Sequence, residues 1–296
     1  MHPYASLQYA RTLAHLGRPI HVGPWNTHLI SRNYGKDVAD AVGPYPLTPL
    51  LPDCDLGGGI ATLRNAGFLT VTLVVDGVTS PSIEDLSKHF TLVRPFKRHY
   101  WFDRGAGEYA PTKHHRYEIR RASRQGVTVR TMQLAAILDN WTALYQGLIA
   151  RHEISGFQHF DRSAFEILST CDGLEAIAAY VGDELVSCHL WFKYGSHVWS
   201  HLAASNERGY ATSASYAVCD FSLRHFEDLA IDLGGSAGTS SQSHDGLSRF
   251  KAGFGNVERT SYLCGAILDN KRYDSLCQKM GATTEEDYFP AYRRPM

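Results

Sequence analysis

Hydrophobic and polar residues follow one another along the chain in patterns that predict a mixed succession of helices and strands. In the first half, helical spacing predicts helices at 5–16, 55–66, 82–89 and 113–125, and alternating or β-branched stretches predict strands at 25–34, 68–75 and 90–102. In the second half, the same criteria predict helices at 132–152, 162–171, 210–229 and 244–252, and strands at 176–181, 184–194, 196–204, 230–233 and 258–268. The proline-rich stretch 43–52 is predicted to be an extended loop. Alternating elements of this kind indicate an α/β protein with helices on the faces of a mixed sheet.

Composition narrows the class of protein. Of the 296 residues, 44% are hydrophobic and 20% are charged, which excludes a disordered polyelectrolyte. No apolar run reaches the length of a membrane span, and the N-terminal stretch lacks the basic flank and apolar run of a secretory signal. The six cysteines are scattered without a C-x-x-C pair, so we expect reduced thiols in a cytoplasmic protein. No spacing of histidines and carboxylates suggests a metal site, and we expect no metal and no tightly bound cofactor.

Positive charge is concentrated in one short segment. The chain as a whole carries a net charge of −1, but residues 113–130 hold six basic side chains and one acidic one. Arg116, Arg120 and Arg124 recur every four residues and therefore share one face of the predicted helix, with Arg121 beside them. Arginine forks suit phosphate oxygens, so this face either docks a polyphosphate donor or is simply a solvated helix surface.

Four segments together resemble the FemABX family of aminoacyl transferases, which has the GNAT acyltransferase fold. They are the basic helix 114–127, the strand 97–103 before it, the strand and glycines 231–235, and the stretch 246–255 (GLSRFKAGFG). The resemblance covers most of the chain. It implies two tandem GNAT-like domains, which we place at 1–112 (acceptor side) and 113–296 (donor side, including the basic helix). It also implies amide formation by transfer from an activated acyl donor.

The resemblance also suggests how the donor is held. The stretch 206–211 (NERGYA) is a degenerate form of the GNAT pyrophosphate loop, in which backbone N–H groups at the start of a helix face an anion. Arg208, Gly209 and Thr212 are the candidate donor-binding residues there, and ordinary turn chemistry explains the pattern as well.

The clearest candidates for chemistry are Phe250 and Lys251. Phe250 stands where GNAT enzymes often carry a tyrosine as general acid, and it has no proton to give. The resemblance associates Lys251 with the donor's phosphates or with the charge developing on the carbonyl oxygen, for which a fixed cation is suited. His201, on the strand 196–204, is a candidate general base, with a core histidine as the alternative.

Acceptor recognition is predicted from residues in loops or at strand ends. In the first half these are Lys36, Tyr45 and Asp103. In the second half, Ser236 follows Gly234 and Gly235, and His244 lies in the polar loop that comes next.

Three functions remain open from the sequence. The first is transfer of an aminoacyl group from aminoacyl-tRNA to an amine such as a peptide or a cell-wall or natural-product precursor, favoured because of the arginine-rich helix and the missing tyrosine. The second is an N-acyltransferase that uses an acyl-coenzyme A thioester. The third is an RNA-binding module without catalysis.

Overall fold

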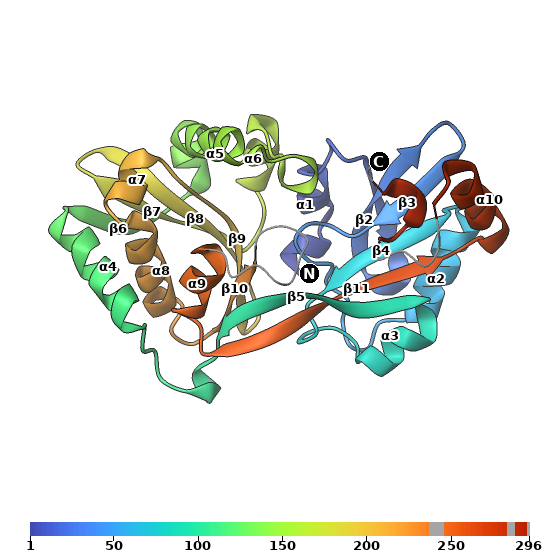
Figure 1. Cartoon of the computed structure of the whole chain (residues 1–296), viewed down its shortest axis with the longest axis horizontal. Coiled ribbons are helices and arrows are strands. Elements are labelled where there is room, and N and C mark those ends of the chain that lie inside the picture. Colours follow the sequence, from blue (N-terminus) through green and yellow to red (C-terminus); the bar gives the residue numbers. More distant parts are fainter. Residues whose placement is uncertain (237–245, 283–287, 295–296) are drawn as a thin grey trace. The chain divides into compact units, whose positions relative to one another are not determined.

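The computed structural model describes residues 1–236, 246–282 and 288–294, and it divides the chain into two compact units (Figure 1). Unit 1 consists of Met1–Phe96 and Thr260–Met296, and unit 2 of Lys97–Arg259. These boundaries differ from the expected 1–112 and 113–296. The first unit ends before residue 112, and the last part of the chain returns to it because β11 (Val257–Ile267) pairs with β4 (Thr70–Val75). Such a non-local pairing has no local signal in the sequence.

Unit 1 is built on a mixed sheet. Its strands β1 (Arg18–Val22), β2 (Thr27–Tyr34) and β3 (Val38–Val42) pair antiparallel in sequence order, and β3 then runs parallel to β4. The helices are α1 (Leu7–Arg11), α2 (Leu56–Asn65), α3 (Ile83–His89) and α10 (Asn270–Met280). The main apolar core lies between the sheet and helices α2 and α3, and it centres on Trp25, Leu29, Val71 and Leu73.

Unit 2 is a six-stranded sheet with helices on both faces. Its strand order is β5-β10-β9-β8-β7-β6, and every neighbouring pair is antiparallel except β9 with β10. The strands are β5 (Leu92–Phe102), β6 (Val127–Met132), β7 (Leu174–Val181), β8 (Glu184–Tyr194), β9 (His197–Ser205) and β10 (Ala230–Gly235). Strand β8 is buried along Leu185–Phe192, and this mostly apolar stretch includes the polar residues Ser187 and His189.

The helices of unit 2 form two groups. Helix α8 (Ala214–His225) packs on β6, β7 and β8, and α4 (Lys113–Arg124) packs on α8. Helix α5 (Leu138–His152) packs on β8 and β9, with α6 (Arg162–Leu168) beside it. Two short helices, α7 (Glu207–Ala211) and α9 (Gly246–Ala252), flank α8 in the chain.

The predicted α/β class is confirmed, and so are most of the predicted elements. The predicted helix 210–229 is interrupted, because Ser213 takes a left-handed conformation (φ 58°) between α7 and α8. The strands β1, β3 and β6 and the helix α10 were not predicted. All six cysteines are free thiols, as expected.

Candidate functional site

Strands β9 and β10 share a ladder over a short distance only. Their parallel pairing joins Ala230–Asp232 to His197–Trp199, and β9 then continues to Ser205. The register of β8 and β9 shifts at the same level, where Leu190 faces Leu202 and Trp191 faces Ser200, so that His201 is an extra residue. Bulges of this kind often lie beside active sites. Beyond Trp199, in the described part of unit 2, the edge of β9 toward β10 therefore carries backbone groups that a ligand could pair with.

Lys251 brings a cation to the end of β10. Its Nζ donates to the carbonyl oxygen of Gly235 at 2.6 Å, and a Cβ placed on Gly234 would lie 2.9 Å from the same nitrogen. Burial, with a contribution from the charge of Lys251, lowers the pKa of His189 on β8 to about 4. The ammonium group is thus fixed just beyond the point where β9 and β10 cease to pair.

A buried histidine–carboxylate pair lies at the same end of β10. His99 on β5 and Asp232 on β10 are joined by Nδ1 and Oδ2 at 2.8 Å, and the N–H of Gly234 donates to the other carboxylate oxygen at 2.7 Å. A Cβ on Gly235 would lie 3.3 Å from the imidazole carbon Cδ2. Lys97 completes the group because its Nζ donates to the carbonyl of Ser236 at 3.3 Å. Lys97, His99, Asp232 and Lys251, with the backbone of 234–236, are called the β10-end site below.

Three members of the β10-end site were not predicted from the sequence. Lys97, His99 and Asp232 lie in segments that carry the family resemblance, but no role was assigned to them there. A carboxylate in the middle of the apolar strand Ala230–Leu233 was the available signal, because a buried charge needs a partner.

His115 ties helix α4 to the helix that carries Lys251. Its Nε2 lies 2.8 Å from the carbonyl oxygen of Phe250, and its Nδ1 lies 2.7 Å from the hydroxyl of Thr112. A Cβ on Gly253 would come within 1.9 Å of the imidazole, so only glycine fits there. The Phe250 ring packs on Tyr216, with ring centres 4.9 Å apart. Phe250 therefore acts through packing and its carbonyl, next to Lys251.

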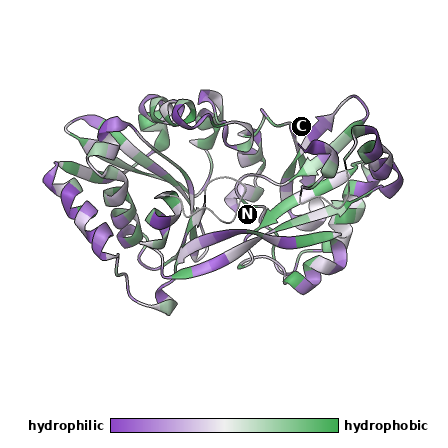
Figure 2. Cartoon of the chain, viewed as in Figure 1, coloured by the Kyte–Doolittle hydropathy of each residue, from purple (hydrophilic) through white to green (hydrophobic). Residues whose placement is uncertain are grey.

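The arginine ridge of α4 (Arg116, Arg120 and Arg124) does not point toward Lys251. The buried residues of α4 are His115, Glu118 and Ala122, which face α8 and α9. The ridge lies on the opposite, exposed face of the helix, and Figure 2 shows α4 as largely hydrophilic. The structure therefore brings His115, not the ridge, together with Phe250.

Arg121 lies at the side of α4 and is held by internal contacts. Its guanidinium donates to the carbonyl of Ala211 at 2.9 Å and contacts Glu118 at 3.3 Å. Glu118 also accepts a hydrogen bond from the hydroxyl of Ser213. Burial is the largest single influence on the pKa of Glu118 and raises it, but the contacts with Ser213 and Arg121 together outweigh burial, so the pKa is lowered. Arg121 thus connects α4 to the start of α8.

The predicted pyrophosphate loop forms helix α7. Arg208 is paired with Glu184 at 2.6 Å, and the hydroxyl of Thr212 donates to the carbonyl of Arg208 at 2.8 Å. Gly209 packs against β8, because a Cβ there would lie 2.1 Å from the carbonyl oxygen of Val186. Close packing accounts for this glycine, and the Arg208 side chain is engaged with a carboxylate.

His201 lies in the core of unit 2. Its ring is 5.1 Å from that of Phe192 and 5.9 Å from that of Phe160, and burial lowers its pKa to about 3. These surroundings favour the alternative of a core histidine over a general base.

The predicted acceptor residues are divided between the two units. Lys36 is exposed in the turn between β2 and β3 of unit 1, and the carbonyl of Tyr45 accepts from the hydroxyl of Tyr9. Asp103 belongs to unit 2, where it pairs with Arg259 at 2.8 Å. Ser236 lies at the β10-end site through its carbonyl, and His244 lies outside the described residues.

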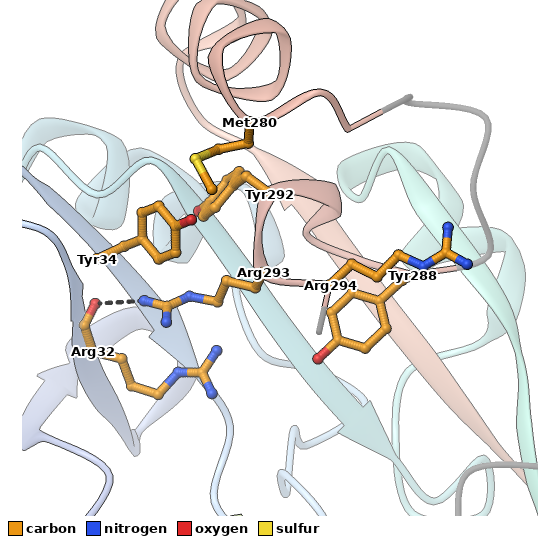
Figure 3. A pocket seen from close by; sticks show the side chains of 7 residues that line it. All are labelled: Arg32, Tyr34, Met280, Tyr288, Tyr292, Arg293 and Arg294. Atoms are coloured by element: carbon orange, nitrogen blue, oxygen red, sulfur yellow. Dashed lines mark hydrogen bonds between the residues drawn. The ribbon is translucent and has the colours of Figure 1, made fainter. Parts of the chain in front are cut away.

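Unit 1 contains a separate pocket of about 260 Å³ (Figure 3). It is lined by Arg32, Tyr34, Met280, Tyr288, Tyr292, Arg293 and Arg294. Behind it, Asp40 is buried and accepts from the Tyr292 hydroxyl and from Nε of Arg293. Burial and the nearby charge of Arg293 lower the pKa of Arg32. The carboxylate of Asp40 thereby anchors the segment 291–293 to β3.

The described residues also bear on metal binding and on membrane insertion. The described ranges hold no group of three or more His, Cys, Asp or Glu side chains arranged to bind a metal ion. Among the helices described, none combines the length and the apolar character required to cross a bilayer.

One family model matches part of the chain. Residues 112–234, which run from the N-cap of α4 to the end of β10, match the family model described as an acetyltransferase (GNAT) domain. No curated protein matches the sequence.

Solved structures share the fold over most of the chain. FemX is 13% identical, with 93% of this chain and 95% of that chain covered and a TM-score of 0.62. L-PGS from Bacillus licheniformis is 15% identical, with coverage of 91% and 89% and a TM-score of 0.63. The C-terminal DUF2156 domain of a protein from Agrobacterium fabrum is 14% identical, with coverage of 90% and 89% and a TM-score of 0.63. The expected GNAT-like fold of FemABX type is therefore confirmed.

Proposed function

We propose that this chain, which carries an acyltransferase domain of the GNAT type at residues 112–234, transfers an aminoacyl group from aminoacyl-tRNA to an amine. The observation that carries the proposal is Lys251, whose ammonium group is held at the end of β10 where β9 and β10 stop pairing. A fixed cation stabilises the oxyanion that forms when an amine attacks a carbonyl carbon.

The chain's own residues support such a step. His115 holds the carbonyl of Phe250 and so fixes α9, while the backbone at Gly234 and Gly235 leaves room for Lys251. Because the cation is oriented before the substrate arrives, it needs no reorganisation during the reaction. The new C–N bond forms first and gives the tetrahedral intermediate, and the C–O bond of the donor ester breaks when that intermediate collapses.

The choice of a tRNA donor rests on the arginine ridge. Arg116, Arg120 and Arg124, with Lys113, make no ion pair with any described carboxylate, whereas Arg98, Arg162, Arg208 and Arg224 in the same unit do. Like charges four residues apart repel one another, so a row of them is suited to a polyanion. The ridge faces away from Lys251, and a donor that reaches both must be large. A folded RNA meets that requirement, and beside the ridge lies the exposed Tyr117, over whose ring the guanidinium of Arg124 is placed at 5.9 Å.

An acyl-coenzyme A thioester is the second candidate donor. The observation in its favour is the family model itself, whose description names acetyltransferases and whose match includes α7 and the start of α8. The internal pairing of Arg208 with Glu184 and of Arg121 with Glu118 weighs against it, because these side chains would have to release their carboxylates to hold a pyrophosphate.

Transfer to an amine acceptor is the first thing to measure. The purified protein is incubated with charged total tRNA and a panel of amine acceptors, with and without ribonuclease, and in parallel with acyl-coenzyme A donors. Product that disappears with ribonuclease supports the tRNA donor. Product that persists with ribonuclease, or heat released on titration with coenzyme A, supports the thioester. RNA binding without product from any donor supports the non-catalytic module.

Two pairs of variants, each a test and its matched control, examine the named residues. Lys251→Met should lower kcat by about 100-fold or more, because oxyanion stabilisation contributes roughly 3–4 kcal/mol in other enzymes. Arg249→Met, on the exposed side of the same helix, should leave kcat unchanged. Neutralising Lys113 and the ridge with glutamine should weaken tRNA binding and flatten its salt dependence. Removing four exposed cations of unit 1 (Arg11, Arg18, Lys271 and Lys279) makes the same change in net charge and should affect tRNA binding less.

A further inference from the structure

The His99–Asp232 pair has the arrangement of a base and the group that orients it. Asp232 is 2% exposed, and its two oxygens accept from the N–H of Gly234 and from the imidazole of His99. An ionised carboxylate only accepts hydrogen bonds, so the proton of a neutral His99 lies on Nδ1. The lone pair is then on Nε2, which is the atom that can accept a proton.

The surroundings of His99 differ from those of two other buried histidines of the sheet, His189 and His201. Burial lowers the pKa of His189 to about 4 and that of His201 to about 3, so neither takes up a proton readily near neutral pH. The side chain of His99 is 10% exposed, whereas its partner carboxylate is 2% exposed. The imidazole of His99 is therefore partly accessible to solvent, whereas the carboxylate of Asp232 behind it is almost completely buried.

His99 also lies next to the candidate oxyanion stabiliser. The imidazole contacts the Gly235 position, to whose carbonyl Lys251 donates. The charged groups around it come from three elements, namely Lys97 on its own strand β5, Asp232 on β10 and Lys251 on α9. A base and a cation that both lie against Gly235 of β10 can serve the two ends of one amine–carbonyl reaction.

We propose that His99 is the general base of the transfer and that Asp232 is its positioning residue, an inference that rests on the proposed function. The acceptor nitrogen attacks the carbonyl carbon and its proton passes to Nε2 of His99. When the tetrahedral intermediate collapses, the C–O bond breaks and the same proton passes to the departing oxygen of the donor. His99 thus ends the cycle neutral, and no further reactant is needed.

The test replaces His99 with asparagine, whose amide nitrogen can still donate to Asp232 but which has no base at the position of Nε2. We expect kcat for aminoacyl transfer to fall by about 100-fold to 10,000-fold, with little change in the KM of the donor. Added imidazole should restore part of the rate. The shape of the pH dependence of kcat/KM should differ between His99→Asn and wild type, whereas loss of a merely structural contact would leave that shape unchanged. Asp232→Asn should lower kcat too, because it allows the other tautomer.

A matched control comes from the same unit. His225 on α8 is paired with Glu175 through Nε2 at 2.8 Å, but on the surface, so His225→Gln removes a comparable pair and should leave kcat unchanged. A second measurement does not depend on activity: long-range ¹H–¹⁵N correlation of wild-type protein should show His99 protonated on Nδ1.

The outcomes separate the two proposals. If His99→Asn keeps the wild-type kcat and the wild-type pH profile while Lys251→Met loses activity, the role of His99 is overturned and the transferase remains. An Nε2-protonated His99 would overturn it as well. Wild-type protein that transfers nothing from any donor would overturn the proposed function and the base together.

Discussion

Acidification to pH 5 should destabilise unit 2 through two of its buried histidines, His189 and His201. The pKa of His189 is lowered to about 4 and that of His201 to about 3, in both cases chiefly because burial penalises the charged form. At pH 5 both remain neutral in the folded protein, whereas in the unfolded chain each is protonated near its ordinary pKa of 6.5. The unfolded state therefore binds more protons, and stability is lost as the pH falls through 6.5 toward the folded values.

The size of the effect follows from these values. Between pH 7.5 and pH 5, each histidine should lower the free energy of unfolding by about 2 kcal/mol. His201→Gln cannot take up a proton, so its free energy of unfolding should fall by about 2 kcal/mol less than that of wild type over the same interval. Because each protein is compared with itself at two pH values, the intrinsic cost of the substitution cancels.

Urea unfolding followed by circular dichroism at the two pH values measures the difference. His152→Gln is the control, because His152 is exposed on α5 of the same unit, and its pH dependence should match that of wild type. If His201→Gln loses as much stability on acidification as wild type does, His201 is not held neutral in the core and the account of its surroundings is refuted.

Three further substitutions test the packing around the sites. Gly253→Ala should destabilise unit 2 by about 1–3 kcal/mol and impair transfer, because the added Cβ would lie 1.9 Å from the His115 imidazole. Thermal melting measures the loss of stability, and Gly246→Ala is the control because its Cβ would meet open space. Gly209→Ala should destabilise unit 2 through contact with the Val186 carbonyl at 2.1 Å, and an unchanged melting temperature would contradict it. Asp40→Asn should lower the stability of unit 1 by about 3–5 kcal/mol, because Arg293 would remain in place without its buried carboxylate partner. Urea unfolding measures this loss, and Asp37→Asn, in the nearby exposed turn, is the control variant.

The local pattern of hydrophobic and polar residues was sufficient to predict most helices and strands, and the elements that it missed were missed for physical reasons. Strand β3 (VADAV) was missed because Asp40 interrupts its apolar pattern, and the charge is tolerated only because Arg293 and Tyr292 reach it from more than 250 residues away. The edge strand β6 alternates exposed and half-buried residues, which gives a weak signal. The break between α7 and α8 depends on a left-handed Ser213, a conformation that the residue type does not announce.

The candidate site was predictable only in part. Lys251 and Phe250 could be located because they lie in a short glycine-flanked segment with a family resemblance. His99 and Asp232 are 133 residues apart, and what brings them together is the register of β5 and β10. Likewise, the sequence indicated that Arg116, Arg120 and Arg124 share a face of α4, but which face meets α9 is decided by the fit of His115 against Gly253.

The discontinuity of unit 1 has a consequence for synthesis on the ribosome. Its last strand pairing, β11 with β4, can form only after residues 262–267 have left the exit tunnel, when the whole of unit 2 has already been made. Unit 2 is continuous in sequence and can begin to fold while β4 still waits for its neighbour. A ribosome that stalls or terminates near residue 259 would thus release a chain whose β4 edge is open to pairing with other molecules, which makes early termination here a route to aggregation.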